Sequence, residues 1–314
     1  MNKVYVGNLF TGEDDRDTYQ DYCYLHKIYA IGWAIDTIPN SIDEYKTIAR
    51  NVFRNKEGKE NRGLNMAISA IEKLESGDFI WTRYSKTGQY LLGKVAKNGQ
   101  DITSADFHHL YESKNGNDVY CLSVPCEKWE IFNMDQVPGI ILNSFRGQTI
   151  KQSSHSQHII NYCSNIFYKT EPSRQDVLAL KSFLSPDDEE DLLGMYLQKK
   201  EHYLMYPSTN KRETDTFEYM LAKEKDDGSI QKAIIQCKMG NTDIELEDFE
   251  DYKTFKIYCV TDEGEVKYKG NTYKGDKPNI HVLSLMDLLI WAKDKDNIDI
   301  LPDRIRENLK ITDF

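Results

Sequence analysis

The chain has 314 residues, more than one hydrophobic core usually supports, so the sequence predicts two domains. Its 39% hydrophobic and 29% charged residues exclude an intrinsically disordered chain and predict that both halves fold. The formal net charge of -11 excludes nucleic-acid binding by bulk electrostatics, which needs a basic domain or stripe, so any nucleic-acid contact must be local.

The first half of the chain shows short strand patterns and two amphipathic helices. A strand is predicted at residues 3–7, and the apolar run at 29–36, with a glycine inside, indicates a buried strand or a bulge. Residues 41–53 carry apolar side chains at helical spacing behind a capping signature that opens at Ser41. A second helix is predicted at 64–74.

A hairpin and further strands follow these helices. Residues 79–84 and 89–95 flank a polar turn and predict the hairpin. Shorter strand patterns occur at residues 119–124, 129–132 and 139–142. We therefore expect an α+β domain that resembles a small β-barrel with two helices, extending to about residue 150.

A polar segment marks the boundary between the two predicted domains. A helix ending at Phe167 precedes the polar residues 169–174, which are typical of a linker. The sequence therefore predicts domains at residues 1–168 and 169–314.

The second domain alternates helices with strands. Helices are predicted at 173–184 and 186–198, and four acids suit the positive N-terminal end of the second. A hairpin follows, and the later elements are strands at 255–260 and 279–283 and a helix that begins near Ser284. This order predicts an α/β fold.

The hairpin of the second domain brings polar side chains together. Its strands are predicted at 217–222 and 233–238, around a turn near Asp227. This register places Glu218 opposite Gln236, and Lys238 shares a face with Gln236 because side chains two apart point the same way. Three polar groups therefore converge at one end of an apolar hairpin.

Such a cluster suits phosphodiester hydrolysis. Oxygen ligands hold Mg²⁺, the metal polarises the phosphate and lowers the pKa of an attacking water, and an ammonium stabilises charge or positions the nucleophile. Lys238 fits the ammonium role, and Glu190 on the preceding helix could add a carboxylate. The alternative for Lys238 is a solvated surface ion pair, but its place after an apolar run and beside Gly240 argues against that reading.

These residues resemble the PD-(D/E)xK nuclease superfamily, and in particular its Mrr-like restriction enzymes, over roughly residues 185–295. The matching segments are the helix that contains Glu190, the acidic segment Thr214 to Tyr219 and the Gln-x-Lys motif within Ile235 to Gly240. The resemblance implies a restriction-endonuclease-like fold, bound Mg²⁺ or Mn²⁺, and catalytic roles at the motif positions. The implied catalytic residues are Glu190, Asp215, Glu218, Gln236 and Lys238, and the implied metal ligands are Asp215, Glu218 and Gln236.

Two departures limit what the resemblance implies. The third ligand is Gln236, where the family usually has an acid. Either Asp215 or Glu218 could be the central acid: the hairpin register favours Glu218, and the usual residue type favours Asp215. Both alternatives stay open.

The first domain resembles the PUA and EVE kind of β-barrel, which in related defence proteins binds a flipped or modified base. The resemblance depends on the segments around Gly32-Trp33, Gly77 to Trp81 and Tyr90 to Val95. Aromatic side chains suit such a pocket because an extracted base is held by stacking and edge hydrogen bonds. It implies nucleic-acid-binding roles for Trp33, Trp81, Arg83 and Tyr90, although aromatic residues in small barrels more often belong to the core.

The sequence therefore predicts a metal-dependent DNA endonuclease of the restriction or phage-defence kind, which its first domain directs to a DNA feature such as a modified base. The alternatives are a catalytically silent nucleic-acid-binding or sensing protein and an RNA-directed nuclease. The expected partner is double-stranded DNA, and we expect a homodimer because duplex cleavage needs two active sites.

The cysteines and apolar runs bear on the compartment. Six cysteines are scattered without CxxC pairs, and no charged and then apolar segment stands at the N-terminus, which predicts a reduced, cytoplasmic chain. No apolar run approaches the roughly 20 residues that span a bilayer, so we expect no membrane contact.

Overall fold

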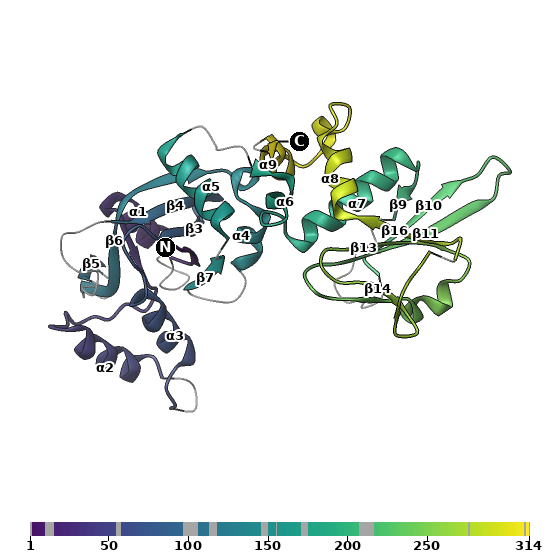
Figure 1. The fold of residues 1–314 in the computed structure, drawn as a ribbon. Helices are drawn as coiled ribbons and strands as arrows, with labels where there is room; N and C mark the ends of the chain where they lie inside the picture. Colours follow the sequence, from purple (N-terminus) through teal and green to yellow (C-terminus); the bar gives the residue numbers. More distant parts are fainter. Residues whose placement is uncertain are drawn as a thin grey trace. The chain divides into compact units, whose positions relative to one another are not determined.

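The computed structural model describes residues 2–9, 16–54, 58–96, 106–112, 118–145, 150–154, 156–170, 175–206, 217–275, 277–310 and 312–313. The chain folds into two compact units, residues 1–174 and 175–314, and both mix helices with strands (Figure 1). The division lies a few residues beyond the predicted boundary. No helix among the described residues has the length and apolar character needed to cross a membrane.

Residues 1–174 contain a curled sheet built around one long strand, β6 (Asp118–Phe132) (Figure 1). One part of β6 pairs with β2 and β5, and the other pairs with β4, so a single strand serves both parts of the sheet. The strand order is β2-β6-β4-β3-β1-β7, with β5 also on β6. The other strands are β1 (Val4–Gly7), β2 (Ile28–Ala30), β3 (Phe79–Tyr84), β4 (Gln89–Val95), β5 (Asp106–Glu112) and β7 (Ile150–Ser154).

Helices cover both faces of this sheet. A core of buried side chains joins one face to α1, α2 and α3. On the other face, the rings of Phe79 and Phe167 meet edge to face at 5.8 Å, which places α5 against the sheet. The helices of this unit are α1 (Arg16–His26), α2 (Ile42–Val52), α3 (Arg62–Ile71), α4 (Gly139–Ser144) and α5 (Gln157–Tyr168).

Several predicted elements of this unit are confirmed. The hairpin forms as β3 and β4, with Thr82 opposite Leu91. Helix α2 begins where expected, since the Ser41 side chain accepts a hydrogen bond from the Glu44 backbone N–H. The Ser41 signature therefore works as the predicted cap.

Other predictions for this unit were wrong. Residues 139–142, predicted as a strand, form helix α4 directly after Pro138. A short apolar run does not distinguish a strand from a buried helix, and proline suits a helix start. The strands predicted at 119–124 and 129–132 are parts of the single strand β6, and helix α1 was not predicted.

Residues 175–314 contain a five-stranded sheet in the order β16-β13-β11-β10-β9. Strand β11 lies at its centre, antiparallel to β10 and parallel to β13. Its strands are β9 (Leu204–Met205), β10 (Tyr219–Glu224), β11 (Ile230–Lys238), β13 (Lys256–Thr261) and β16 (Ile280–Ser284). Two small sheets combine β12 (Ile244–Glu245) with β14 (Val266–Tyr268) and β15 (Asn271–Thr272), and β8 (Gln175–Asp176) with β17 (Thr312–Asp313).

Two hydrophobic clusters enclose the central sheet. One packs α7 (Pro186–Lys200) and α8 (Leu285–Lys293) against it, with Ala233, Ile235 and Cys237 of β11 pointing into the cluster. The other involves Ile234 and the 3-10 helix η3 (Leu246–Tyr252). The remaining helices are α6 (Val177–Leu180), η4 (Ile298–Ile300) and α9 (Asp303–Lys310).

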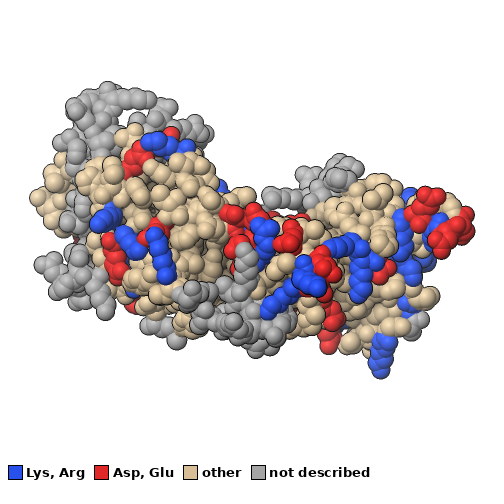
Figure 2. Space-filling view, turned by 90° about the horizontal axis from the view of Figure 1, so that it is seen from above, with Lys and Arg blue, Asp and Glu red and all other residues tan. Residues whose placement is uncertain are grey.

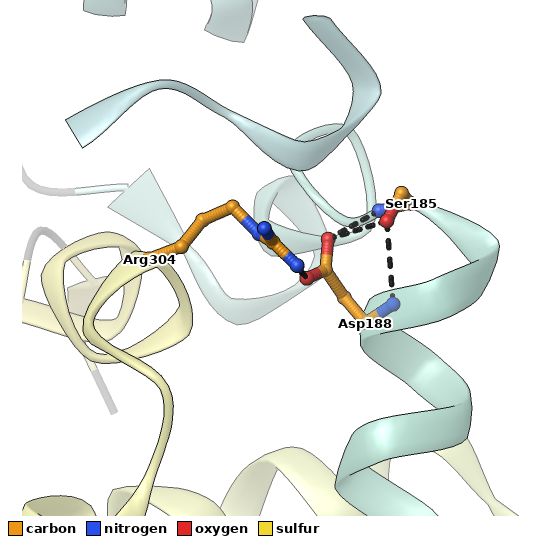
Figure 3. Close-up of polar contacts among 3 residues, drawn as sticks. All are labelled: Ser185, Asp188 and Arg304. Atoms are coloured by element: carbon orange, nitrogen blue, oxygen red, sulfur yellow. Dashed lines mark hydrogen bonds and ion pairs between the residues drawn. The ribbon is translucent and has the colours of Figure 1, made fainter. Parts of the chain in front are cut away.

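A polar network fixes the start of α7 (Figure 3). Ser185 caps the helix by accepting a hydrogen bond from the Asp188 backbone N–H at 3.2 Å. The Asp188 carboxylate accepts in return from the Ser185 N–H and hydroxyl, at 2.7 and 2.8 Å. Arg304 of α9 forms an ion pair with the same carboxylate, so α9 is tied to the first turn of α7.

The hairpin predicted in this unit is confirmed, and one helix is not. Tyr219 pairs with Ile235 and Leu221 with Ala233, which centres the hairpin on Asp227 as expected. The helix predicted at 173–184 was wrong in extent, because only α6 is helical and β8 precedes it. Strand β8 pairs with β17 at the other end of the unit, a contact that local patterns do not reveal.

Candidate active site

The site begins with two side chains held by the hairpin. The Glu218 backbone N–H donates to the Ile235 carbonyl at 2.9 Å, which ties Glu218 to β11 directly before the first ladder pair of β10, Tyr219 with Ile235. The Gln236 Nε2 donates to the Glu218 Oε1 at 3.2 Å. Gln236 is only 2% exposed, so this contact lies inside the protein.

The next side chain on the same face of β11 is Lys238, which is partly exposed. Burial raises the pKa of Glu218, while the Lys238 ammonium and the hydrogen bond from Gln236 oppose the rise. The Lys238 ammonium therefore lies within electrostatic range of the Glu218 carboxylate. The contact between Gln236 and Glu218 is the one that the predicted register gives, and Lys238 follows Gln236 on the same face of β11.

Glu190 reaches this cluster from α7. Burial raises the pKa of Glu190 to about 7, the Glu218 carboxylate adds to the rise, and the Lys238 ammonium opposes it. The helix thus places a second carboxylate within electrostatic range of the hairpin pair. Two carboxylates, one amide and one ammonium form the candidate site.

The oxygen atoms of this cluster fit a divalent cation. The Gln236 Oε1 is buried and has no hydrogen-bond partner among the described residues. A buried acceptor without a partner costs free energy, which a ligand contact can offset. Glu218 raises the pKa of Glu190, and burial raises the pKa of both carboxyls, so the two half-buried carboxylates would also gain from a cation, since Mg²⁺ prefers such oxygen ligands.

The described part of the chain contains no group of three or more His, Cys, Asp or Glu side chains arranged to hold a metal ion. The candidate ligands within the described residues are therefore two carboxylates, Glu190 and Glu218, and the amide oxygen of Gln236. Asp215, the other candidate for the central acid, lies outside the described residues.

The sequence reasoning missed a buried carboxylate beside this cluster. Glu189 is fully buried, and neither of its carboxylate oxygens has a hydrogen-bond partner among the described residues. Burial and then the Asp262 carboxylate raise the pKa of Glu189 to about 8, against the effect of Lys181. Lys181 and Asp262 form an ion pair, and the Asp262 N–H donates to the Lys238 carbonyl at 3.2 Å.

The four acids at the start of α7 gave a partial signal for Glu189. They marked a helix N-terminus, but the pattern did not show which acid faces inward. Successive helix residues differ by about 100° in direction, so neighbours such as Glu189 and Glu190 have different surroundings.

The nucleic-acid-binding candidates of residues 1–174 do not converge on one site. Trp81 is fully buried, and its indole N–H donates to the Cys163 sulfur at 3.3 Å. Arg83 and Tyr90 pair across β3 and β4 on the same face as Trp81. Trp33 packs against the core that joins the sheet to α1, α2 and α3.

The surroundings of these side chains differ as well. The Arg83 guanidinium lies 5.0 Å from the centre of the Phe145 ring, and the Tyr90 ring lies 5.4 Å from the same ring. Trp33 is partly exposed and meets Phe53 edge to face at 5.2 Å. In this conformation, Arg83 and Trp33 offer surface to a ligand, while Trp81 serves the core.

The surface charge agrees with the composition. On the face drawn in Figure 2, Lys and Arg side chains are interspersed with Asp and Glu, and large areas carry neither. A broad basic footprint is not seen on that face, so a nucleic-acid contact there would be local.

No protein-family model matches the chain, and no curated protein or solved structure matches it. The functional reading therefore depends on the site's own residues.

Proposed function

We propose that this chain is a metal-dependent endonuclease with a restriction-endonuclease-like fold in residues 175–314. The observation that carries the proposal is the contact between Gln236 and Glu218, with Lys238 on the same face of β11 and Glu190 within electrostatic range. This arrangement combines oxygen ligands and an ammonium at one end of a central strand.

The proposal assigns the metal to the oxygen ligands and the phosphate charge to the ammonium. Glu218 and the Gln236 Oε1 would hold Mg²⁺ or Mn²⁺, and Glu190 would bind the ion or its waters. Such an ion polarises a phosphate and lowers the pKa of a bound water. The Gln236 Nε2 fixes the Glu218 carboxylate, and the Lys238 ammonium stabilises charge on the phosphate or positions the nucleophile.

The test is cleavage of duplex DNA, unmodified and cytosine-modified, with Mg²⁺ or Mn²⁺ and the full chain. We expect Lys238→Ala to lower the cleavage rate by about 100-fold or more, the usual effect of removing a group that stabilises developing charge. Lys225→Ala, in the exposed turn of the same hairpin, removes an equal charge away from the site and should cleave normally. Cleavage that survives Lys238→Ala would contradict the site assignment.

The central acid is tested by a matched pair of variants. Glu218→Ala removes the partner of Gln236, so we expect it to abolish cleavage if Glu218 is the central ligand. If the central ligand is instead Asp215, which has the residue type usual in the family, Asp215→Ala should be the more damaging variant. Calorimetric titration of Mn²⁺ into both variants separates lost metal binding from lost chemistry.

A second candidate function is a catalytically silent nucleic-acid-binding or sensing protein. It is favoured by the lack of a group of three metal-ligating acids, cysteines or histidines in the described chain. Binding of nucleic acid without cleavage of any DNA or RNA substrate would support it. Cleavage of RNA alone would instead support the RNA-directed nuclease.

The proposal extends to residues 1–174 and to assembly. We propose that the curled sheet of this unit is a PUA- or EVE-like reader of a modified base, with Arg83 and Trp33 as contacts in preference to Trp81 and Tyr90, which are buried. Duplex cleavage by one site per chain implies a homodimer on double-stranded DNA. Light scattering that detects only monomer, with and without DNA, would contradict the dimer.

A further inference from the structure

A pocket of about 610 Å³ opens in residues 1–174, lined by side chains of α3, β1 and β7. Sites for small molecules usually measure about 300–1,000 Å³, so a ligand of nucleotide size fits. The lining differs from the candidate base contacts at Trp33, Trp81, Arg83 and Tyr90. The pocket also belongs to a different unit from the proposed nuclease site.

The pocket carries two cations without an ion-pair partner among the described residues. Arg62 and Lys73 both line it, and neither forms an ion pair with a described residue. The one carboxylate in the lining, Glu60, already accepts from the Asn65 Nδ2 at 3.0 Å, and Asn65 accepts in turn from the Arg50 Nε at 3.0 Å. The lining thus holds two cations against one carboxylate in a chain with a net charge of -11, and this local excess of positive charge favours an anionic ligand.

The wall of the pocket adds the hydroxyl of a buried tyrosine. Tyr5 lines the pocket and is only 4% exposed, yet its hydroxyl forms no hydrogen bond with a described residue. Burial, followed by Asp78 and Glu75, raises the pKa of Tyr5 to about 12, so the hydroxyl keeps its proton at neutral pH. A hydroxyl donor in the wall of a pocket, without a partner among the described residues, suits a ligand that brings an acceptor.

The remaining lining sets the shape of the ligand. Apolar side chains, among them Met66 and Ile150, line the pocket together with Tyr5. The ligand should therefore carry an anion, a hydrogen-bond acceptor and a body with apolar surface.

We propose that this pocket binds a nucleoside monophosphate, either as a free nucleotide or as one unit of a single strand. Arg62 and Lys73 hold the phosphate. The Tyr5 hydroxyl donates to an acceptor on the base or sugar, whose ring packs on the apolar wall.

The test is isothermal titration calorimetry of the full chain in EDTA, which removes metal-dependent binding at the proposed nuclease site. The probes are deoxycytidine monophosphate, deoxyadenosine monophosphate, inorganic phosphate and a short single-stranded oligodeoxynucleotide. Binding of a mononucleotide supports the free nucleotide as the source, and binding of the oligonucleotide alone supports the strand. In both cases inorganic phosphate should bind more weakly.

The variants separate the pocket from general charge effects. We expect Arg62→Ala and Lys73→Ala each to weaken binding about tenfold or more, as for a lost charge-assisted hydrogen bond. Tyr5→Phe keeps the ring in the core and should weaken binding about threefold to tenfold through the hydroxyl alone. Lys86→Ala removes a charge elsewhere in the same unit and should bind like the unaltered chain.

The proposal is overturned if neither nucleotide nor oligonucleotide binds, or if inorganic phosphate binds as tightly as the nucleotides. It is also overturned if Lys86→Ala weakens binding as much as Arg62→Ala. Because EDTA is present throughout, these results are independent of whether the chain is a nuclease.

Discussion

The ion pair between Arg304 and Asp188 gives a sharp test of what holds the candidate site in place. Asp188 is 1% exposed and accepts from the Arg304 Nε at 2.7 Å, so Arg304→Ala leaves a buried carboxylate without its cation. Breaking a buried pair in this way costs about 3 kcal/mol or more. The hydrogen bonds from Ser185 remain, and we therefore take the lower end, about 3 kcal/mol, as the expected loss in the free energy of unfolding.

A matched control lies two residues further along α9. Arg306 forms an ion pair with Asp303 three residues earlier, and the Asp303 side chain is 52% exposed. Exposed pairs of this kind contribute about 0.3–0.5 kcal/mol. Arg306→Ala therefore removes the same side chain from the same helix and should change the stability little.

The assay is urea unfolding followed by fluorine NMR of chains labelled with fluorotryptophan. Trp291 is the only tryptophan beyond residue 174, and its ring lies 5.5 Å from that of Tyr196 on α7, so its signal reports on this unit. With a urea dependence of about 2 kcal/mol per M, a loss of 3 kcal/mol lowers the midpoint by about 1.5 M. A midpoint for Arg304→Ala equal to that of Arg306→Ala would refute the reasoning.

Three further predictions concern single side chains. Gln236→Glu supplies a carboxylate where the unaltered chain has an amide oxygen, so half-maximal cleavage should need a lower Mg²⁺ concentration. A metal titration in which this variant needs a higher Mg²⁺ concentration would argue against Gln236 as a ligand. Burial raises the pKa of Glu189 from 4.5 to about 8, so between these pH values the folded state holds a proton that the unfolded chain releases. The stability that this group contributes is therefore full below pH 4.5 and is lost as the pH rises through 8. Glu189→Gln should therefore flatten the pH dependence of the urea midpoint in EDTA, and an unchanged slope would contradict the assignment. Trp81→Ala should cost about 3–5 kcal/mol of stability because the Trp81 ring is fully buried. The fluorine signals of the other tryptophans in the same unit report the urea midpoint of the variant. An unchanged midpoint would contradict the place of Trp81 in the core.

The hairpins were predictable because their information is local. In both, two strand patterns flank a polar turn, and the alternation of side chains fixes the register once the turn is placed. Centring the second hairpin on Asp227 brought Glu218 opposite Gln236, and the ladder has that register. The hairpin part of the candidate site thus followed from strand geometry alone.

The elements that the sequence did not predict depend on distant partners. Strand β8 forms through β17, more than 130 residues later, so its own residues carry little signal. The two short strand patterns near residue 125 join because β6 has different partners along its length, β2 and β5 on one part and β4 on the other. In each case tertiary pairing decides what local propensity leaves open.

The choice between neighbouring acids on α7 shows how distant contacts also shape the site. The run of acids from Asp187 to Asp191 marks the helix start, but the direction of each side chain depends on how the helix is rotated about its axis. That rotation is fixed by the Ser185 cap and by Arg304, which hold Asp188 (Figure 3). With Asp188 held, Glu189 is buried near Asp262, and Glu190 lies within range of Glu218 and Lys238. Arg304→Ala should therefore lower cleavage without touching the site, and Arg306→Ala should not, which links the stability experiment to the proposed chemistry.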